Sequence, residues 1–430
     1  MTWDAVVVGG GIAGLVAARE LAREGLRTLV LEGRDAPGGA VRGHTVAGLR
    51  LDAGAESFAT RGGVVAALLD ELGLTDRVRT PEPHGSWVHL PHGDGPLPRT
   101  GLLGIPADPW AADVRRTIGL RGALRASLDL ALPPSSADTL GELVRRRMGA
   151  RVLDRLVRPV VGGVHAADPD DLAVDAVSQG LPDALRRERG SLARAVRSLR
   201  ASAPAGSAVQ GIDGGLHVLV AALVADIEAH GGTIRTRATV TSLDDERTDR
   251  WVLATPAAVD LLGLPVGHPD PGAQVTLVTL VLDAPALDAA PRGTGVLVAR
   301  EATDVSAKAL THGTAKWAWL AEAAGAGRHV VRLSYGRAGE EGAEPDVDTA
   351  LRDAAVLLGT PLSPEQLVGH AVVRWTQALP RPSAEHARVV GEVRAAVEAL
   401  PGVAVCGAWV AGNGLASVIP DARGAARSVL

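Results

Sequence analysis

The sequence is poor in several residue types, and each scarcity excludes a class of protein. Its 430 residues contain one cysteine, which rules out internal disulfide bonds and a cysteine-cluster metal site. Because 49 acidic residues outnumber 44 basic ones, the formal net charge is −5, and the chain lacks the basic surface of a nucleic-acid-binding protein. No apolar run approaches the roughly 20 residues that span a bilayer. Apolar stretches such as Val6–Val8 and Gln274–Leu282 have the length of strands.

Phenylalanine, tyrosine, asparagine and lysine are scarcer still. The chain has one Phe, one Tyr, one Asn and two Lys, whereas Trp reaches eight and 42 of the basic residues are Arg. The scarce residues share A/T-rich codons, so we interpret their scarcity as a bias of the coding sequence towards G and C. With 46% hydrophobic residues, the chain is predicted to be globular, and its length predicts more than one domain. We expect a cytoplasmic protein, since the chain runs from Met1 straight into a strand. Contact with a membrane surface stays open.

Periodicity predicts strand–helix units at both ends of the chain and a different middle. The first unit is a strand at Asp4–Val8, a glycine turn, a helix closed by Gly25 and a strand at Arg27–Leu31. The remaining patterns predict helices at Val64–Leu72, within Ala111–Leu199, and at Gly214–Ala229, Asp346–Leu358, Glu385–Leu400 and Ile419–Leu430. They predict strands at Thr233–Arg235, Ala238–Leu243 and Val403–Cys406. A hairpin region is expected at Pro81–Pro109, and a mostly antiparallel sheet from Gln274 to about Gly336.

The N-terminal turn matches the fingerprint of a dinucleotide-binding site. Gly9, Gly11 and Gly14 form a Gly-x-Gly-x-x-Gly turn between an apolar strand and a helix, and Glu32 ends the next strand. The first glycine permits a tight turn, the second lets the backbone approach a pyrophosphate, and the third lets helix and strand pack closely. The helix N-terminus offers free N–H groups to the phosphates. Glu32 is placed to accept ribose hydroxyls and would repel a 2′-phosphate, which disfavours NADP.

Further glycine segments favour a flavin cofactor over NAD. Gly38-Gly39 follow the carboxylate, and Gly54–Ser57 come where an NAD dehydrogenase would return to strand–helix repeats. Near the C-terminus, Val403–Cys406 and Gly407 lead into Gly412–Val418 and then into a helix. Such a strand, glycine and helix N-terminus are suited to hold a flavin ring and its ribityl–phosphate arm.

These motifs together resemble the FAD-dependent amine oxidase superfamily and, within it, the protoporphyrinogen and coproporphyrinogen oxidases. The resemblance runs over nearly the whole chain. It is carried by Gly54–Phe58, Arg158–Ala166, Gly211–Leu216, Gly295–Val298 with Lys316-Trp317, Arg332–Arg337, and Arg374-Trp375 with Ala378–Pro380.

The resemblance implies an α/β flavoprotein with three parts. We predict a discontinuous Rossmann-like FAD-binding domain (1–80, 205–255 and 385–430), a mixed, mostly antiparallel-sheet substrate-binding domain (81–105 and 256–384) and a helical domain (106–204). The activity implied is the oxidation of coproporphyrinogen III to coproporphyrin III in haem biosynthesis, in three two-electron steps with oxygen as acceptor. Ser86 stands where animal and plant protoporphyrinogen oxidases carry an Arg, which favours the bacterial coproporphyrinogen branch. The same logic implies a hand-over of the porphyrin to a metal chelatase.

The predicted cofactor is non-covalent FAD, because the surroundings of Cys406 do not match those of cysteine-linked amine oxidases. By resemblance, Val240 meets the adenine end and Trp375 lies near the flavin. The predicted cofactor-binding residues are Gly9, Gly11, Ile12, Ala13, Gly14, Glu32, Gly33, Gly38, Gly39, Ala40, Arg42, Gly54, Ala55, Glu56, Ser57, Val240, Trp375, Gly407 and Val418. No catalytic side chain is assigned and no metal is expected, because the flavin carries the redox step.

The propionates of a tetrapyrrole need cationic or amide partners, and the sequence offers several candidates. Arg42 and Arg61 lie near the flavin segments, although a solvated surface charge is the simpler reading of each. His165 replaces a Tyr of the family. Lys308 is eight residues from the only other lysine, Lys316, and an ordinary ion pair is the alternative for both. Substrate positioning is further in question at Gly414-Leu415-Ala416 and Leu379–Pro382, where the chain departs from the family.

Four other functions stay open. Protoporphyrinogen IX is the alternative substrate. An amine oxidase would line its substrate path with an aromatic pair, which one Phe and one Tyr make hard to build. A carotenoid-type desaturase would need a long apolar tunnel. A non-enzymatic escort protein would use the same fold to bind a partner or lipid without a redox flavin.

Overall fold

The structure is a computed structural model, and it describes residues 2–91, 93–134, 137–165, 168–174, 180–201, 208–270, 272–337, 345–379 and 384–430. The chain forms two compact units, and both are discontinuous. The first comprises Met1–Pro81, Ser207–Gly272 and Trp375–Leu430; the second comprises Glu82–Gly206 and Ala273–Arg374. Helical residues 112–201 and the large sheet, except residues 375–379 of its last strand, belong to the second unit. The division into three domains stays a prediction.

A parallel five-stranded sheet forms the centre of the first unit. Its order is β10 (Thr233–Arg235), β2 (Thr28–Leu31), β1 (Ala5–Val8), β11 (Trp251–Leu253) and β17 (Val403–Val405). Strands β1, β2 and β11 are buried at every residue, as expected of a parallel sheet covered on both faces.

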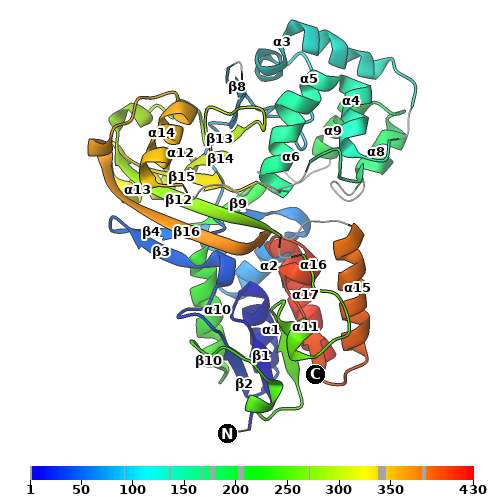
Figure 1. Cartoon of the computed structure of the whole chain (residues 1–430), viewed down its shortest axis with the longest axis vertical. Helices are drawn as coiled ribbons and strands as arrows, with labels where there is room; N and C mark the ends of the chain where they lie inside the picture. The colour runs from blue at the N-terminus through cyan, green and yellow to red at the C-terminus, as the bar shows by residue number, and fades with distance from the viewer. Residues whose placement is uncertain are drawn as a thin grey trace. The chain divides into compact units, whose positions relative to one another are not determined.

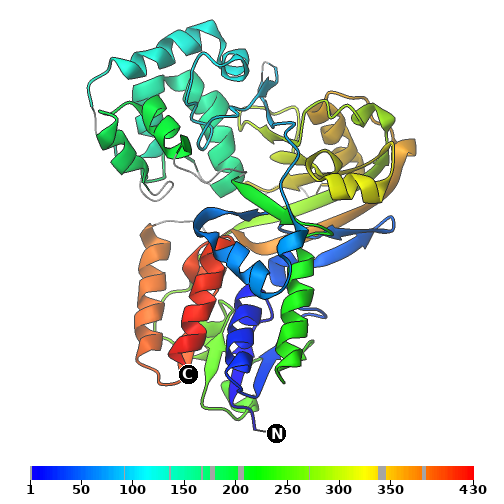
Figure 2. The same ribbon diagram turned by 180° about the vertical axis from the view of Figure 1, so that it is seen from behind.

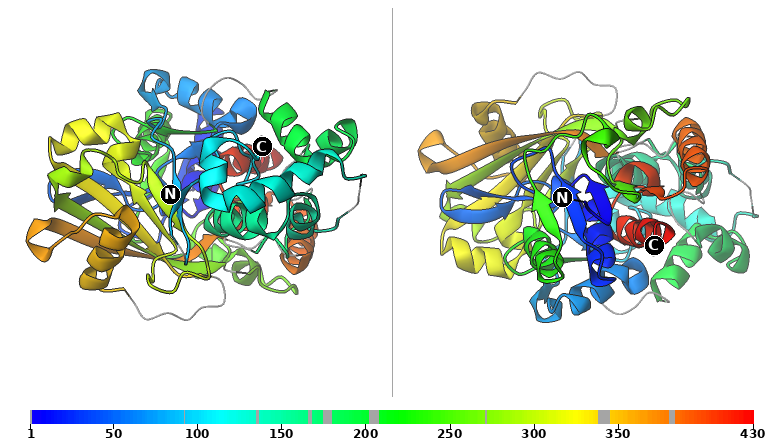
Figure 3. Two further views of the ribbon diagram at one scale, coloured as in Figure 1. Left: turned by 90° about the horizontal axis from the view of Figure 1, so that it is seen from above. Right: turned by 90° about the horizontal axis from the view of Figure 1, so that it is seen from below.

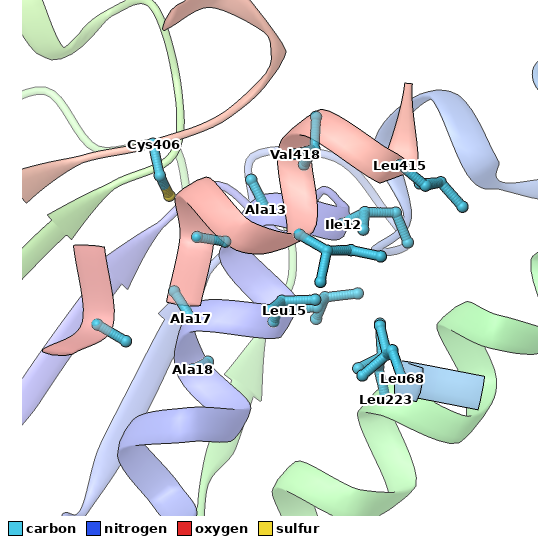
Figure 4. Packing of buried hydrophobic residues seen from close by; sticks show 14 of the residues in the cluster. Ile12, Ala13, Leu15, Ala17, Ala18, Leu68, Leu223, Cys406, Leu415 and Val418 are labelled. Atoms are coloured by element: carbon cyan, nitrogen blue, oxygen red, sulfur yellow. The ribbon is translucent and has the colours of Figure 1, made fainter. Parts of the chain in front are cut away.

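Helices cover both faces of this sheet. On one face, α1 (Ile12–Arg23) lies between α10 (His217–Ala229) and α17 (Leu415–Ser428), as Figures 1 and 2 show. Ala13 and Ala17 of α1 are small enough for close packing against α17 (Figure 4). On the other face, α15 (Ala384–Glu398) lies against β17 and adds its buried valines to the core under the sheet. The predicted Rossmann-like fold is confirmed.

Short elements complete the first unit. They are η1 (Gly39–Val41), β3 (Gly43–Val46), β4 (Leu49–Asp52), β5 (Phe58–Ala59), η2 (Arg61–Gly63), α2 (Val64–Glu71), η3 (Thr75–Arg77), β6 (Val78–Arg79), β9 (Val209–Ile212), η6 (Leu243–Asp245), α11 (Ala258–Leu261) and α16 (Ala408–Ala411). Strands β3 and β4 form a hairpin, and β9 pairs with both β5 and β6.

The second unit holds a seven-stranded sheet. Its order is β16 (Leu367–Leu379), β12 (Ala273–Asp283), β15 (Arg328–Tyr335), β14 (Ala309–His312), β13 (Gly295–Val298), β7 (Trp87–His89) and β8 (Gly95–Pro96). The pairings of β12 with β15, β15 with β14, β14 with β13 and β7 with β8 are antiparallel, whereas β13 and β7 run parallel. The predicted mixed, mostly antiparallel sheet is confirmed. Around it lie η7 (Pro285–Leu287), α12 (Gly313–Lys316), α13 (Ala318–Ala324), α14 (Val347–Leu358) and η8 (Pro364–Gln366).

The remaining described helices of the second unit lie together (Figure 3) and have a hydrophobic core of their own. They are α3 (Ala112–Ser127), η4 (Leu128–Leu130), α4 (Leu140–Met148), α5 (Ala150–Val152), η5 (Leu153–Val157), α6 (Arg158–His165), α8 (Leu181–Arg187) and α9 (Leu192–Ala201). A buried Asp129 ties them together, because its carboxylate accepts from Nε of Arg147 at 2.7 Å and from the first backbone amides of α9.

Three predicted boundaries were wrong. Residues 238–242 form no strand, because the ladder pairing of this segment ends at Arg235 and the chain then turns into η6. Helix α10 begins at His217 and not at Gly214, whose φ of +85° is unlike that of a helix. Helix α17 begins at Leu415 and contains Pro420, since Leu415, Val418 and Ile419 bury one face in the core. Among the described residues, no helix is long and apolar enough to cross a membrane.

Candidate functional site

The glycine turn after β1 has the backbone geometry that its sequence predicts. Gly9 has a φ of +101° and donates its N–H to Leu31 O at 2.8 Å. A Cβ at Gly14 would lie 1.8 Å from Gly9 O, so only glycine lets α1 pack this closely on the turn. A Cβ at Gly11 would meet nothing within 4 Å. Gly11 therefore faces open space, while Gly14 faces the protein.

The first turn of α1 has backbone donors to offer. Gly11 is the N-cap residue and provides no side-chain cap, and no acidic residue lies in the first turn. The N–H groups at the start of such a helix, at Ile12 and Ala13, carry partial positive charge and suit an anion.

A second glycine segment lies against the first. Gly38 donates its N–H to Gly10 O at 2.7 Å and forms a bridge with Gly11. Gly38 and Gly39 both have positive φ angles, and a Cβ on Gly39 would lie 3.2 Å from Gly11 Cα. The structure thus brings together two predicted segments that are more than twenty residues apart. We call Gly9, Gly11, Gly38 and Gly39 the glycine cradle.

The Glu32 carboxylate is held at the edge of this cradle. Its Oε2 accepts from Gly10 N at 2.8 Å, and its Oε1 accepts from Arg34 N at 2.8 Å. Each carboxylate oxygen can accept more than one hydrogen bond, so capacity for ribose hydroxyls is left. Two backbone donors fix the orientation of the side chain before a ligand arrives.

The predicted adenine-side residues lie beside Glu32. Ala238 N donates to Glu32 O at 2.9 Å, which holds the segment leading to Val240 next to the end of β2. Gly33 leaves room for Thr239, whose Oγ1 would be 3.1 Å from a Cβ at that position. Val240 is partly buried and packs in the same core as β1.

The predicted flavin-side residues form a second cluster. Ala55 N donates to Ala40 O and Ala53 N donates to Arg42 O, both at 2.9 Å, so these two segments pair. Trp375 is buried and donates its Nε1 to Ala53 O at 3.1 Å. The guanidinium of Arg42 lies 5.1 Å from the centre of the Trp375 ring, within cation–π range.

Gly54 makes this cluster compact. A Cβ there would lie 2.2 Å from Ala40 O and 3.1 Å from Cζ2 of Trp375. Glu56 and Ser57 follow in the same stretch and are partly buried, whereas Ala55 is exposed.

The C-terminal residues approach the first turn of α1. Gly407 has a φ of +121°, and a Cβ on it would lie 3.6 Å from Cβ of Ala13. Val418 is buried in α17 in the same core (Figure 4). Cys406 is fully buried, and burial raises the pKa of its thiol, which is the state of an inert core residue.

Sequence reasoning missed the residue that fixes this turn. Asp421 of α17 accepts from Gly407 N at 2.9 Å and from Nη2 of Arg394 at 2.6 Å. Nothing in the local pattern distinguishes Asp421 from any acidic residue on a helix surface, because its partner lies fourteen residues earlier.

These groups fit FAD. The open side of the glycine cradle and the uncapped α1 suit a pyrophosphate, and the pre-oriented Glu32 suits a ribose. The cluster of Gly54, Arg42 and Trp375 comes from the segments expected beside the flavin. All nineteen predicted cofactor residues belong to the first unit.

The four substrate candidates are divided between the units. Arg42 and Arg61 belong to the first unit. Arg61 is exposed in η2 and takes no part in the contact between Arg42 and Trp375. His165 ends α6 in the second unit, and its side chain lies outside those described, as do residues 166 and 380–382 of the family segments. Lys308 is buried in the second unit.

The second unit also buries two polar pairs whose partners the sequence did not predict. Tyr335 OH donates to Oδ2 of Asp353 at 3.2 Å, and burial with the nearby carboxylate raises the pKa of this phenol. Nε2 of His312 lies 3.0 Å from Nδ1 of His329, and burial lowers the pKa of His312 to about 3. Within the described ranges, no group of three or more His, Cys, Asp or Glu side chains could hold a metal ion.

Comparison with known proteins gives a consistent family. Residues 12–259 match the family described as flavin containing amine oxidoreductase. Coproporphyrinogen III oxidase of Mycobacterium tuberculosis is 31% identical, with 99% of this chain and 96% of the relative aligned. Coproporphyrinogen III oxidase of Bacillus subtilis is 25% identical over 99% and 97% of the two chains.

A solved structure gives the same fold. A protein from Exiguobacterium sp. 255-15, assigned as a protoporphyrinogen oxidase, superposes with a TM-score of 0.83 at 24% identity, over 99% of this chain and 98% of that one.

Proposed function

The chain belongs to the family of flavin-containing amine oxidoreductases, and from that membership we propose that it oxidises coproporphyrinogen III to coproporphyrin III in haem biosynthesis. When bound, FAD supplies the acceptor for two electrons in each of three rounds, with oxygen as the final acceptor. The observation that carries the cofactor site is the glycine cradle, whose Gly11 faces open space beside a fixed Glu32.

Each part of the first unit then has a binding task. The α1 amides and the glycine cradle hold the pyrophosphate, and Glu32 accepts the ribose hydroxyls. Gly407 closes the turn beside Ala13 for the phosphate arm. Trp375, anchored on Ala53 O, gives the Gly54 segment a rigid wall near the flavin.

The placement of the rare aromatics speaks against an amine oxidase. Phe58 is 3% exposed in the core of the first unit. Tyr335 is 5% exposed and its hydroxyl is bound to Asp353. Neither side chain is available to line a substrate path, so only Trp side chains could form the aromatic pair of an amine oxidase.

Aerobic turnover tests the proposal. Purified protein should be yellow with flavin absorption bands, and incubation with coproporphyrinogen III should raise porphyrin fluorescence above autoxidation. A parallel incubation with protoporphyrinogen IX decides between the two substrates. A colourless protein that cannot be loaded with FAD would favour the escort protein, and no gain in fluorescence with either porphyrinogen would reject the function.

Peripheral contact with a membrane is a second part of the proposal, and it is supported by one surface. Five of the ten exposed large hydrophobic side chains among the described residues fall within 110–130: Trp110, Leu120, Leu124, Leu128 and Leu130. Leu120, Leu124 and Leu128 are spaced by four residues and are 61%, 59% and 51% exposed. Arg115, Arg116 and Arg121 are exposed in the same segment. We call this set the leucine face.

The chemistry of the leucine face suits an anionic lipid surface. Apolar side chains with a Trp and flanking cations are the pattern of interfacial helices. Vesicles with anionic lipids should bind the protein more than neutral ones, and a Leu120→Asp, Leu124→Asp variant should lose this binding. Val372→Asp, at another exposed apolar position, is the matched control. A cytoplasmic location and the hand-over to a metal chelatase stay predictions.

A further inference from the structure

Lys308 is a buried cation with an incomplete set of partners. The residue is 9% exposed, and its Nζ donates to Gly336 O at 2.7 Å. An ammonium carries three N–H donors, so one backbone carbonyl leaves two unused. No carboxylate in the described part of the chain forms an ion pair with it. Burial of a charge without a counter-ion is costly, which makes this arrangement unusual for a purely structural lysine.

A second cation lies near Lys308. Burial and, to a smaller extent, the charge of Arg337 lower the pKa of Lys308 to about 8. Arg337 donates its Nη2 to Val298 O at 3.3 Å. Lys308, with two unused donors and a second cation nearby, can therefore accept an anion.

The position of Lys308 is fixed by its backbone. Lys308 N donates to Ser334 O at 2.8 Å, and Val298 N donates to Lys308 O at 3.0 Å. Just before it, the amides of Ser306 and Ala307 donate to Oδ2 of Asp353, at 3.1 and 2.9 Å. Asp353 is thus occupied in holding the chain that leads to the lysine, and Tyr335 donates to the same oxygen.

The acceptor is fixed as well. Gly336 has a φ of +89°, and a Cβ there would lie 2.3 Å from Gln274 O, so the turn presenting its carbonyl requires glycine. The ammonium therefore has a defined place at the ends of β13, β14 and β15, unlike a surface lysine with many rotamers.

We infer that Lys308 binds a carboxylate of the substrate, with Arg337 contributing to the same anion site in the second unit. The inference rests on the proposed function, because a porphyrinogen brings propionate groups: four in coproporphyrinogen III and two in protoporphyrinogen IX. A carboxylate would use the two free N–H donors and supply the missing negative charge. Because the positive charge of Lys308 would attract the carboxylate, a neutral side chain of similar size should weaken the binding of substrate and leave the binding of FAD unchanged.

The kinetic test compares the only two lysines. Lys308→Met should raise KM for coproporphyrinogen III roughly 10- to 100-fold, the loss expected for one hydrogen bond between charged groups, with kcat within about twofold. Lys316→Met is the control: its Nζ lies 5.1 Å from the Trp317 ring, so its loss should leave KM unchanged. Flavin content and thermal midpoint report whether either variant is merely misfolded. An unchanged KM in a folded, yellow Lys308→Met protein would overturn the inference while the proposed function stands.

A second test needs no variant of Lys308 to fold. Protein labelled with isotopic lysine gives side-chain signals from two residues only, and Lys316→Met assigns them. Coproporphyrin III, a stable product with the same carboxylates, should shift the Lys308 signal and leave that of Lys316 in place. Saturable porphyrin binding that leaves Lys308 unmoved contradicts the inference. A wild-type protein that neither binds the porphyrin nor oxidises the porphyrinogen contradicts the proposed function, and the inference with it.

Discussion

The two units differ in the groups that face their proposed ligands. In the first unit, FAD would meet backbone amides and the space left by glycines, whereas in the second unit a substrate carboxylate would meet a buried cation. In the glycine cradle, Gly11 leaves open space, and the groups facing it are N–H donors at the start of α1. At Lys308, the site is one side chain whose place is set by Ser334, Asp353 and Gly336, which come from later segments. The first arrangement combines the turn after β1 with the glycines that follow β2, and its glycine spacing is visible in the sequence. The second depends on side-chain and backbone partners that no spacing in the sequence marks.

This difference explains what each unit can tolerate. A backbone site fails when a side chain is added, and a side-chain site fails when one is removed. Substitutions in the two units should therefore separate cofactor binding, stability and substrate binding.

The largest effect is expected at Gly14. Gly14→Ala places a Cβ 1.8 Å from Gly9 O, so α1 must move away from the turn, at a cost of about 3 kcal/mol in the free energy of unfolding. Urea denaturation of the FAD-free protein measures this loss. Full stability of the variant would show that α1 does not pack as closely as described.

Gly11→Leu should damage binding without damaging the fold. Its φ of −70° suits any residue, and its Cβ meets no protein atom, so the stability of the FAD-free protein should change by less than about 0.5 kcal/mol. Affinity for FAD should fall by about 100-fold or more, because the side chain occupies the approach to the pyrophosphate. Flavin absorbance after gel filtration measures retention. A fully yellow Gly11→Leu protein would place the phosphates elsewhere.

Acid should destabilise the protein through His312. Burial lowers its pKa to about 3, and the unfolded value is near 6.5, so only the unfolded state takes up this proton between those values. Stability from this group is complete above pH 6.5 and falls below it by about 1.4 kcal/mol per pH unit. His312→Phe should make the unfolding free energy less dependent on pH between 6 and 5 than in the wild type. Equal slopes would mean that His312 is charged in the folded protein.

The smallest effect is expected at Tyr335. Tyr335→Phe removes one hydrogen bond to Asp353 and should cost about 1 kcal/mol, because two backbone amides still satisfy the carboxylate. FAD retention should not change. Denaturant titration and flavin content measure the two quantities. A loss of flavin would contradict the expectation that a substitution in the second unit leaves FAD binding unchanged.

The sequence predicts the cofactor side better than the substrate side, for a physical reason. Gly9, Gly11, Gly14 and Glu32 act through backbone geometry within one strand–helix–strand unit, so their spacing carries the information. The orientation of Glu32 by two backbone amides, and the role of Asp421, depend on partners that only folding brings near.

The errors have the same origin. Residues 238–242 read as a strand from their β-branched side chains, but Ala238 bonds to Glu32 at a strand end and the ladder does not continue. Pro420 suggested a helix start, whereas burial of Leu415 and Val418 against α1 extends the helix before it. Lys308 was chosen for its rarity. Its burial, its hydrogen bond to Gly336 O and the nearby charge of Arg337 come from the folded structure, and the local pattern does not reveal them.

The most direct test of the whole account is an anaerobic single turnover. FAD-loaded protein is mixed with coproporphyrinogen III without oxygen, and the flavin absorption band is followed before and after air is admitted. The account predicts that the band bleaches, then returns with air while porphyrin emission grows. A flavin band that stays unchanged in the presence of coproporphyrinogen III would contradict it.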